Sequence, residues 1–256
     1  MLSKKTLKQL SELKHARERK AQGLFTVEGS KLVAELLDSE FLTEVIYVTE
    51  RWIEANNVVF PEHIPVGMLS GSEMERISNL TTPPGILAVA RIRNFDTVPA
   101  VVPAEWTLVL DGISDPGNLG TILRTAEWFG IRTIFCSEKT VDVYNPKVVQ
   151  SSMGSVFRVL VMETDLNELL KNAVHSGVVV VGALMDGRQP NVQLKNKAGG
   201  ILLLGSESHG ISPELMPHIT HPVTISRFPD LGQDMPESLN AAVAAGILMY
   251  FLRSSS

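Results

Sequence analysis

Three polar, glycine-containing stretches hold the residue types that bind anions or orient a reacting group. The first covers residues 111–120 and leads into a helical run that includes Arg124. Gly117 and Gly120 let the backbone approach a ligand closely, and the following helix N-terminus offers free N–H groups to an anion. If Asn118 lies in the helix cap, it and Arg124 can border one pocket, where a guanidinium suits a phosphate. An N-cap asparagine plus a surface arginine would give the same spacing.

The second stretch covers residues 202–212. A predicted strand ends in Gly205, Glu207 follows, and Gly210 precedes Ser212, a candidate helix cap. A buried carboxylate at a strand end needs a hydrogen-bond donor or a cation, and Arg124 is the predicted partner of Glu207. The stretch is not a serine nucleophile elbow, because a histidine replaces the second glycine of that motif.

The third stretch covers residues 225–240 and precedes an apolar helix. Ser238 and Asn240 stand at the start of this helix, where buried polar groups act as caps or contact a ligand. Residues 241–252 are apolar on all sides and rich in small residues, so something must cover the helix. Burial within the domain and a homodimer interface both satisfy that pattern.

Several classes of protein are excluded or disfavoured. The six histidines show no metal-ligand spacing and Cys136 lies on a predicted strand, so we expect no metal site. A single cysteine rules out an intrachain disulfide and fits a reducing cytoplasm. The longest apolar runs, 178–185 and 241–252, fall short of the roughly 18 residues of a membrane span. The first twenty residues are charged throughout and lack the apolar core of a secretory signal.

The three stretches follow strands in an alternating pattern of strands and helices. The predicted strands are 106–110, 132–136, 156–161, 178–184, 201–204 and 222–225, and the predicted helices are 118–129, 165–175, 212–218 and 238–252. Residues 178–181 are apolar on both faces, as in a sheet covered by helices on both sides. The pattern predicts an α/β, doubly wound, mostly parallel sheet, whose ligands bind beyond the carboxyl ends of the strands.

Residues 1–93 are predicted to form a smaller α/β domain. Its predicted helices are 3–20, 31–37 and 72–80, the last with a capping box at Ser72 and Glu75, and its predicted strands are 24–27, 44–48 and 86–92. Residues 94–105 contain two prolines and have no helical period, which indicates a linker before a second domain over residues 106–256.

Charge is distributed unevenly along the chain. The 256 residues are 44% hydrophobic and 20% charged, which is typical of a globular protein and excludes a disordered one. The formal net charge is −5, yet residues 1–20 hold seven Lys or Arg against two Glu. Such a basic segment on an acidic body either binds a polyanion or is a solvated amphipathic helix.

Together and in this order, the three stretches resemble the motifs of SpoU-type RNA 2′-O-ribose methyltransferases (the TrmH family) of the SPOUT superfamily. The resemblance rests on residues 118–126, 204–210 and 238–240, and residues 150–156 look like a further loop of that family. It implies a SPOUT α/β-knot, with a C-terminal trefoil knot in the doubly wound sheet. It also implies a small ribosomal-protein-like RNA-binding domain at the N-terminus and a homodimer formed through the knotted domains.

The resemblance also implies a reaction: methylation of a ribose 2′-hydroxyl in RNA, with S-adenosyl-L-methionine (AdoMet) as cofactor and ribosomal RNA a better candidate than transfer RNA. The implied catalytic residues are Arg124, Asn118, Glu207, Ser238 and Asn240, and the implied cofactor-binding residues are Leu204, Gly205, Gly210, Ile225 and Leu239. Because an arginine keeps its proton at ordinary pH, Arg124 is better suited to stabilise a developing alkoxide than to act as a base.

The third motif departs from the family. Ile225–Arg227 replaces the usual hydrophobic-Pro-Met tripeptide, and the loop that follows is longer. Arg227, Phe228 and Asp230 are therefore candidates for shaping substrate access.

Two other functions stay open. The first is a non-catalytic RNA-binding protein that retains the fold. The second is a nucleotide-dependent oxidoreductase, which the missing G-x-G-x-x-G and the missing acidic ribose partner disfavour.

Overall fold

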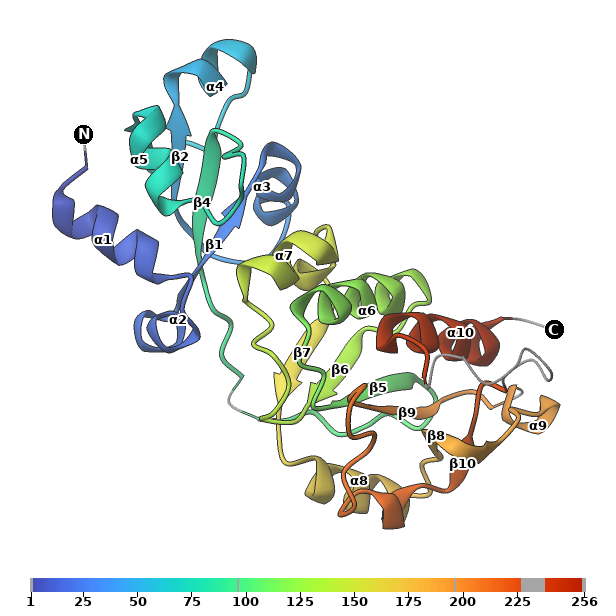
Figure 1. The fold of residues 1–256 in the computed structure, drawn as a ribbon. Coiled ribbons are helices and arrows are strands. Elements are labelled where there is room, and N and C mark those ends of the chain that lie inside the picture. Colours follow the sequence, from blue (N-terminus) through green and yellow to red (C-terminus); the bar gives the residue numbers. More distant parts are fainter. Residues whose placement is uncertain (1, 96, 196, 227–237, 255–256) are drawn as a thin grey trace, which may run out of the picture. The chain divides into compact units, whose positions relative to one another are not determined.

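The chain forms two compact units in the computed structural model, which describes residues 2–95, 97–195, 197–226 and 238–254 (Figure 1). The N-terminal unit comprises residues 1–94 and 142–157, and the C-terminal unit comprises residues 95–141 and 158–256. Residues 142–157 thus pack with the N-terminal unit although they lie inside the predicted range 106–256. The chain therefore passes between the units three times.

The N-terminal unit is built on a four-stranded sheet in the order β1-β4-β2-β3. Its strands are β1 (Leu24–Glu28), β2 (Thr43–Thr49), β3 (Val66–Leu69) and β4 (Ile86–Arg91). Its helices are α1 (Lys4–Glu12), α2 (Ala16–Gln22), α3 (Ser30–Leu37), α4 (Glu50–Ala55), α5 (Gly71–Ile77), α7 (Pro146–Ser152) and the 3-10 turn η1 (Ser155–Phe157). Strands β2 and β3 are parallel, and the other pairs are antiparallel. Leu7, Leu10 and Leu13 pack into one core cluster with residues of β2, β4 and α5, so their spacing of three marks the buried side of this segment.

The predicted helix over 3–20 is wrong as a single helix. It breaks after Glu12, and α2 begins at Ala16. The side chain of Arg19, only 1% exposed, fills the corner and donates from Nη1 to the carbonyl oxygen of Leu13 at 2.8 Å. Its Nε and Nη2 donate to Asp142 at 2.8 and 2.5 Å. Arg19 is therefore a structural cation rather than part of an exposed basic segment.

Two further expectations for this unit need correction. The capping box is formed by Ser70 and Glu73, two residues before the predicted pair, and α5 accordingly begins at Gly71. The short elements α4 and β3 were not predicted, because neither is long enough to show a clear hydrophobic period.

The C-terminal unit confirms the predicted doubly wound sheet. Six strands follow the order β10-β8-β9-β5-β6-β7, and all neighbouring pairs are parallel. The strands are β5 (Trp106–Asp111), β6 (Thr133–Cys136), β7 (Leu160–Glu163), β8 (Val180–Arg188), β9 (Gly200–Gly205) and β10 (His221–Val223). The helices are α6 (Pro116–Trp128), α8 (Leu166–His175), α9 (Val192–Lys195), α10 (Ala241–Arg253) and the 3-10 turn η2 (Met216–His218).

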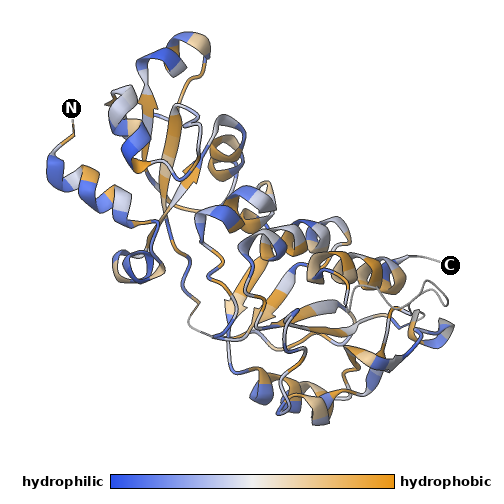
Figure 2. Ribbon diagram, in the orientation of Figure 1, coloured by the Kyte–Doolittle hydropathy of each residue, from blue (hydrophilic) through white to orange (hydrophobic). Residues whose placement is uncertain are grey.

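Helices cover both faces of this sheet. Helices α6 and α10 lie on one face and α8 on the other (Figure 1). The central strands are coloured as hydrophobic in Figure 2, and every residue of β5 is buried. The two buried faces explain why the strands read as continuous apolar runs.

Three elements predicted within residues 106–256 differ in the structure. The predicted strand over 156–161 is η1 followed by β7, and the predicted helix over 212–218 is reduced to η2. Helix α10 begins at Ala241, with Asn240 as its cap. This helix is not fully covered within the chain, since Val243, Ile247 and Tyr250 are exposed.

Among the residues that the structure describes, no helix is long and apolar enough to cross a membrane, and no three or more His, Cys, Asp or Glu side chains lie together as potential metal ligands.

Replacing Arg19 with Met should destabilise the N-terminal unit. The substitution removes three donors and leaves the partly buried Asp142 carboxylate without its cation, which costs about 2–4 kcal/mol. The free energy of unfolding in urea measures the effect. Arg17→Met, at an exposed position of the same helix, is the matched control and should change that free energy by less than about 0.5 kcal/mol. Equal stability of the two variants would contradict the structural role of Arg19.

Candidate active site

The first site residue lies at the start of α6. Asp115 is the N-cap and its Oδ1 accepts the backbone N–H of Asn118 at 2.8 Å, with Pro116 as the first helical residue. Asn118 therefore lies in the first turn rather than in the cap. The dipeptide Asp115-Pro116 is a sequence signal for this helix start, since both residues are favoured at those two positions. The helix thus begins two residues earlier than predicted.

A chain of side-chain hydrogen bonds joins the three motif loops. Asn118 donates from Nδ2 to Oε1 of Glu207, and Asn240 donates from Nδ2 to Oδ1 of Asn118 at 2.9 Å. Asn240 also caps α10, because its Oδ1 accepts the N–H groups of Ala242 and Val243 at 3.0 and 3.3 Å. The structure thus brings together three predicted site residues separated by up to 122 positions in sequence.

The direction of these bonds is set by α10. Because backbone N–H groups can only donate, Asn240 must present its oxygen to the helix and its amide nitrogen to Asn118. Asn118 must then present its own nitrogen to Glu207. The helix N-terminus therefore orients the Glu207 carboxylate through two amides.

Arg124 is not the partner of Glu207, and that prediction is wrong. Its side chain is exposed on α6 and makes no hydrogen bond or ion pair within the described ranges. Glu207 obtains its hydrogen bond from the side-chain amide of Asn118, in the first turn of α6. The guanidinium of Arg124 is consequently available to an external group.

The loop after β9 is a tight turn with no room for a side chain at its base. Ser206 and Gly210 exchange two backbone hydrogen bonds of 3.1 and 2.9 Å. A Cβ on Gly205 would lie 2.1 Å from the carbonyl carbon of Gly210. Gly210 has a φ of 68°, a left-handed conformation that favours glycine. Both glycines are therefore required by the shape of the turn, in which residues 207–209 are exposed.

The sequence did not single out Asp111. This residue ends β5 opposite Gly205 of β9, and its side chain is buried, with 4% of its surface exposed. Its Oδ2 accepts the backbone N–H of Ser212 at 2.7 Å, so Ser212 is held by Asp111 and is not the helix cap that the sequence suggested. An aspartate directly after the apolar run 108–110 is the signal that would have identified it.

The remaining predicted residues occupy the ends of neighbouring elements. Leu204 is buried at the end of β9, and half-buried Ile225 lies two residues past β10. Ser238 and Leu239 are exposed immediately before Asn240. Their individual roles stay predictions. Arg227, Phe228 and Asp230 lie outside the described residues.

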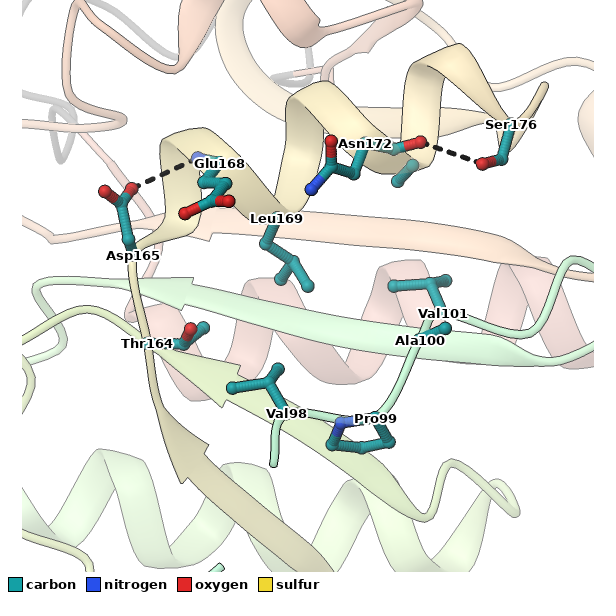
Figure 3. Close-up of a pocket in the computed structure, with 11 residues that line it drawn as sticks. Val98, Pro99, Ala100, Val101, Thr164, Asp165, Glu168, Leu169, Asn172 and Ser176 are labelled. Atoms are coloured by element: carbon teal, nitrogen blue, oxygen red, sulfur yellow. Dashed lines mark hydrogen bonds between the residues drawn. The ribbon is translucent and has the colours of Figure 1, made fainter. Parts of the chain in front are cut away.

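A groove of the C-terminal unit lies apart from these loops. It runs between residues 98–101 and helix α8, with Asp165 at one end and Ser176 at the other (Figure 3). None of the predicted site residues lines it. Val101 packs against the core cluster of α8, so this part of the predicted linker is attached to the C-terminal unit.

The sheet and its site define an α/β protein that binds a ligand beyond the carboxyl ends of parallel strands. Residues 105–250 match the SpoU rRNA methylase family, and residues 4–88 match the MRM3-like substrate-binding domain. The chain therefore belongs to the SpoU rRNA methylase family.

Individual relatives agree with this assignment. The chain is 30% identical to the 23S rRNA (guanosine(2553)-2′-O)-methyltransferase RlmP of Bacillus subtilis, over 96% of this chain and 95% of the relative. It is 38% identical to a TrmH-family structure from Porphyromonas gingivalis, with a TM-score of 0.83 and coverage of 99% and 98% of the two chains. An AdoMet-bound rRNA methyltransferase from Sinorhizobium meliloti is 26% identical with a TM-score of 0.82, over 99% of this chain and 95% of that one.

Replacing Gly205 with Ala should open the turn after β9. The added Cβ collides with the backbone of Gly210, which cannot move without breaking its two bonds to Ser206. Hydrogen exchange of the Ser206 and Gly210 amides measures the change, and we expect exchange at least about tenfold faster. Gly246→Ala is the control, because a Cβ there meets only a methyl carbon at 3.7 Å. Unchanged protection in Gly205→Ala would show that the turn tolerates a side chain.

Proposed function

We propose that this protein methylates a ribose 2′-hydroxyl in ribosomal RNA, with AdoMet as the methyl donor. The observation that carries the proposal is the hydrogen-bonded chain from Asn240 through Asn118 to Glu207. It joins the three family motifs at the carboxyl ends of the strands, and the exposed Arg124 lies on the same helix, α6, as Asn118.

Arg124 and Glu207 supply complementary parts of the chemistry. A ribose hydroxyl is a weak acid, so its oxygen must be aligned and its developing negative charge stabilised. Arg124 provides a permanent positive charge and planar donors for that oxygen or for a neighbouring phosphate. Glu207, fixed by Asn118, can accept a hydrogen bond from a ribose hydroxyl and so orient the sugar.

The turn after β9 fits a cofactor recognised through the backbone. Residues 207–209 of the turn are exposed, and they follow Gly205, where there is no room for a side chain. The residue after the turn, Ser212, is held by its hydrogen bond to Asp111. When bound, AdoMet supplies an activated methyl group on a sulfonium. We assign Leu204, Gly205 and Gly210 to this site, together with Ile225 and Leu239 from the neighbouring loops.

The RNA substrate is assigned from the N-terminal unit and from the relatives. This unit matches a substrate-binding domain, and the relatives include a 23S rRNA methyltransferase. Six of the seven cations in residues 1–20 are exposed, Arg19 being the exception. An exposed basic segment attracts a polyanion through the phosphates, whatever its sequence. Transfer RNA is the alternative substrate, and mapping the methylated nucleotide distinguishes the two.

We further propose a cytoplasmic homodimer with a trefoil knot. Exposed Val243, Ile247 and Tyr250 share one side of α10, and Trp128 on neighbouring α6 is 84% exposed. An apolar surface of this kind on a soluble unit is typical of a subunit interface. The knot follows from the family resemblance; residues 227–237, between β10 and α10, lie outside the described residues.

Removing the guanidinium of Arg124 should abolish most activity without weakening cofactor binding. We expect Arg124→Ala to lower kcat for methyl transfer at least about a hundredfold, because a donor to the developing charge is lost. Transfer of radiolabelled methyl groups to RNA and calorimetric titration of AdoMet measure the two effects. Arg132→Ala is the control, since Arg132 is an exposed arginine just before β6, at the opposite edge of the sheet. Normal RNA binding without methyl transfer in the wild-type protein would instead favour a non-catalytic RNA-binding protein.

Reversing charge in α1 should weaken RNA binding selectively. We expect Lys4→Glu with Lys5→Glu to raise the Kd for RNA at least about tenfold and to reduce its salt dependence, while AdoMet binding is unchanged. Fluorescence anisotropy with labelled ribosomal RNA measures the change. Lys31→Glu with Lys171→Glu alters the net charge equally at exposed sites outside this segment. If both double variants bind RNA equally, the effect is one of net charge and α1 is not the RNA-binding element.

A further inference from the structure

Asp111 is a buried acidic side chain that has no cationic partner among the described residues. It is 4% exposed and lies at the end of the central strand β5. Within the described residues its only hydrogen bond comes from the neutral backbone N–H of Ser212, and it forms no ion pair. Burying a carboxylate without a counter-charge is costly, so a fold retains such a group where something compensates it.

The second oxygen of this carboxylate is not fully enclosed by the described residues. Oδ1 accepts no hydrogen bond from the described residues. If it were fully buried, it would be a buried oxygen without a partner, but the sole such side-chain atom among these residues is Thr26 Oγ1. Oδ1 must therefore contact the surface. Asp111 lies next to the turn after β9, because Asp111 and Gly205 are register partners on adjacent strands and such strands lie about 4.8 Å apart. Its Oδ2 accepts the N–H of Ser212, which follows that turn.

The methyl donor and its demethylated product differ in charge at one atom, the sulfur. AdoMet carries a positive sulfonium, whereas its demethylated product S-adenosylhomocysteine has a neutral thioether in the same place. A carboxylate in a partly buried site distinguishes such ligands, since charge interactions weaken far less there than in water.

We propose that Asp111 is a specificity-determining residue that favours the cationic methyl donor over the neutral product. This inference rests on the proposed function, because it assumes that the turn after β9 holds the cofactor. Asp111 would then have two tasks: Oδ2 holds Ser212 in place, and the carboxylate charge compensates the sulfonium. After methyl transfer that compensation is lost, which weakens retention of the product.

The isosteric variant Asp111→Asn separates the two tasks. An asparagine oxygen can still accept the N–H of Ser212, but the negative charge is gone. Calorimetric titration of the full-length protein with AdoMet, with S-adenosylhomocysteine and with sinefungin, which bears an ammonium group in place of the sulfonium, gives three dissociation constants. We expect about tenfold weaker binding of the two cationic ligands and a change of less than about threefold for S-adenosylhomocysteine.

Asp165→Asn is the matched control. Asp165 is an exposed aspartate of the same unit, and its carboxylate also accepts backbone N–H groups, at the start of α8. The variant removes one negative charge and should leave all three constants unchanged. Binding of S-adenosylhomocysteine by Asp111→Asn also reports that the turn is intact.

The other outcomes overturn either the inference about Asp111 or the proposed function. Equal weakening of all three ligands would show that Asp111 only shapes the turn, and no change in any would show that it does not face the cofactor. Both results overturn this inference and leave the proposed function intact. Failure of the wild-type protein to bind AdoMet or S-adenosylhomocysteine, with or without RNA, would overturn the proposed function itself.

Discussion

The site depends on the side-chain amide of Asn118. It is the only group in the described hydrogen-bonded chain that contacts both other motif loops, accepting from Asn240 and donating to Glu207. Each amide has one donor end and one acceptor end, so the chain has a single direction, set by the N–H groups of α10. A change of residue type at 118 would therefore alter two loops at once.

The acidic side chains around the site have different environments. Glu207 is exposed and receives an amide donor, whereas Asp111 is buried and receives a backbone donor. Neither is paired with Arg124, whose positive charge is thus available for the proposed contact with RNA. A salt bridge between Arg124 and Glu207 would neutralise both groups that the proposed chemistry needs. Because they are not paired, each keeps its charge for its proposed role.

The N-terminal unit includes residues 142–157, which lie in sequence between strands β6 and β7 of the C-terminal unit. Residues 142–157 contribute Asp142, the partner of Arg19, and Tyr144, whose ring centroid lies 4.6 Å from that of Phe25. Burial raises the pKa of Tyr144 to about 12, so this ring stays neutral at physiological pH. The segment contains the stretch 150–156 that resembles a family loop. The proposed RNA-binding unit and this loop thus share one core.

The sequence by itself determined the alternating strand and helix order, the parallel sheet and the three polar stretches, because burial on both faces leaves long apolar runs between glycine-rich turns. It also identified Asn118, Glu207 and Asn240 as candidates. Only the tertiary structure decided how they pair, that Arg19 is buried, and that Asp111 ends its strand beside Gly205. These contacts join residues up to 123 positions apart, and neither local propensity nor hydrophobic period carries information over such a separation.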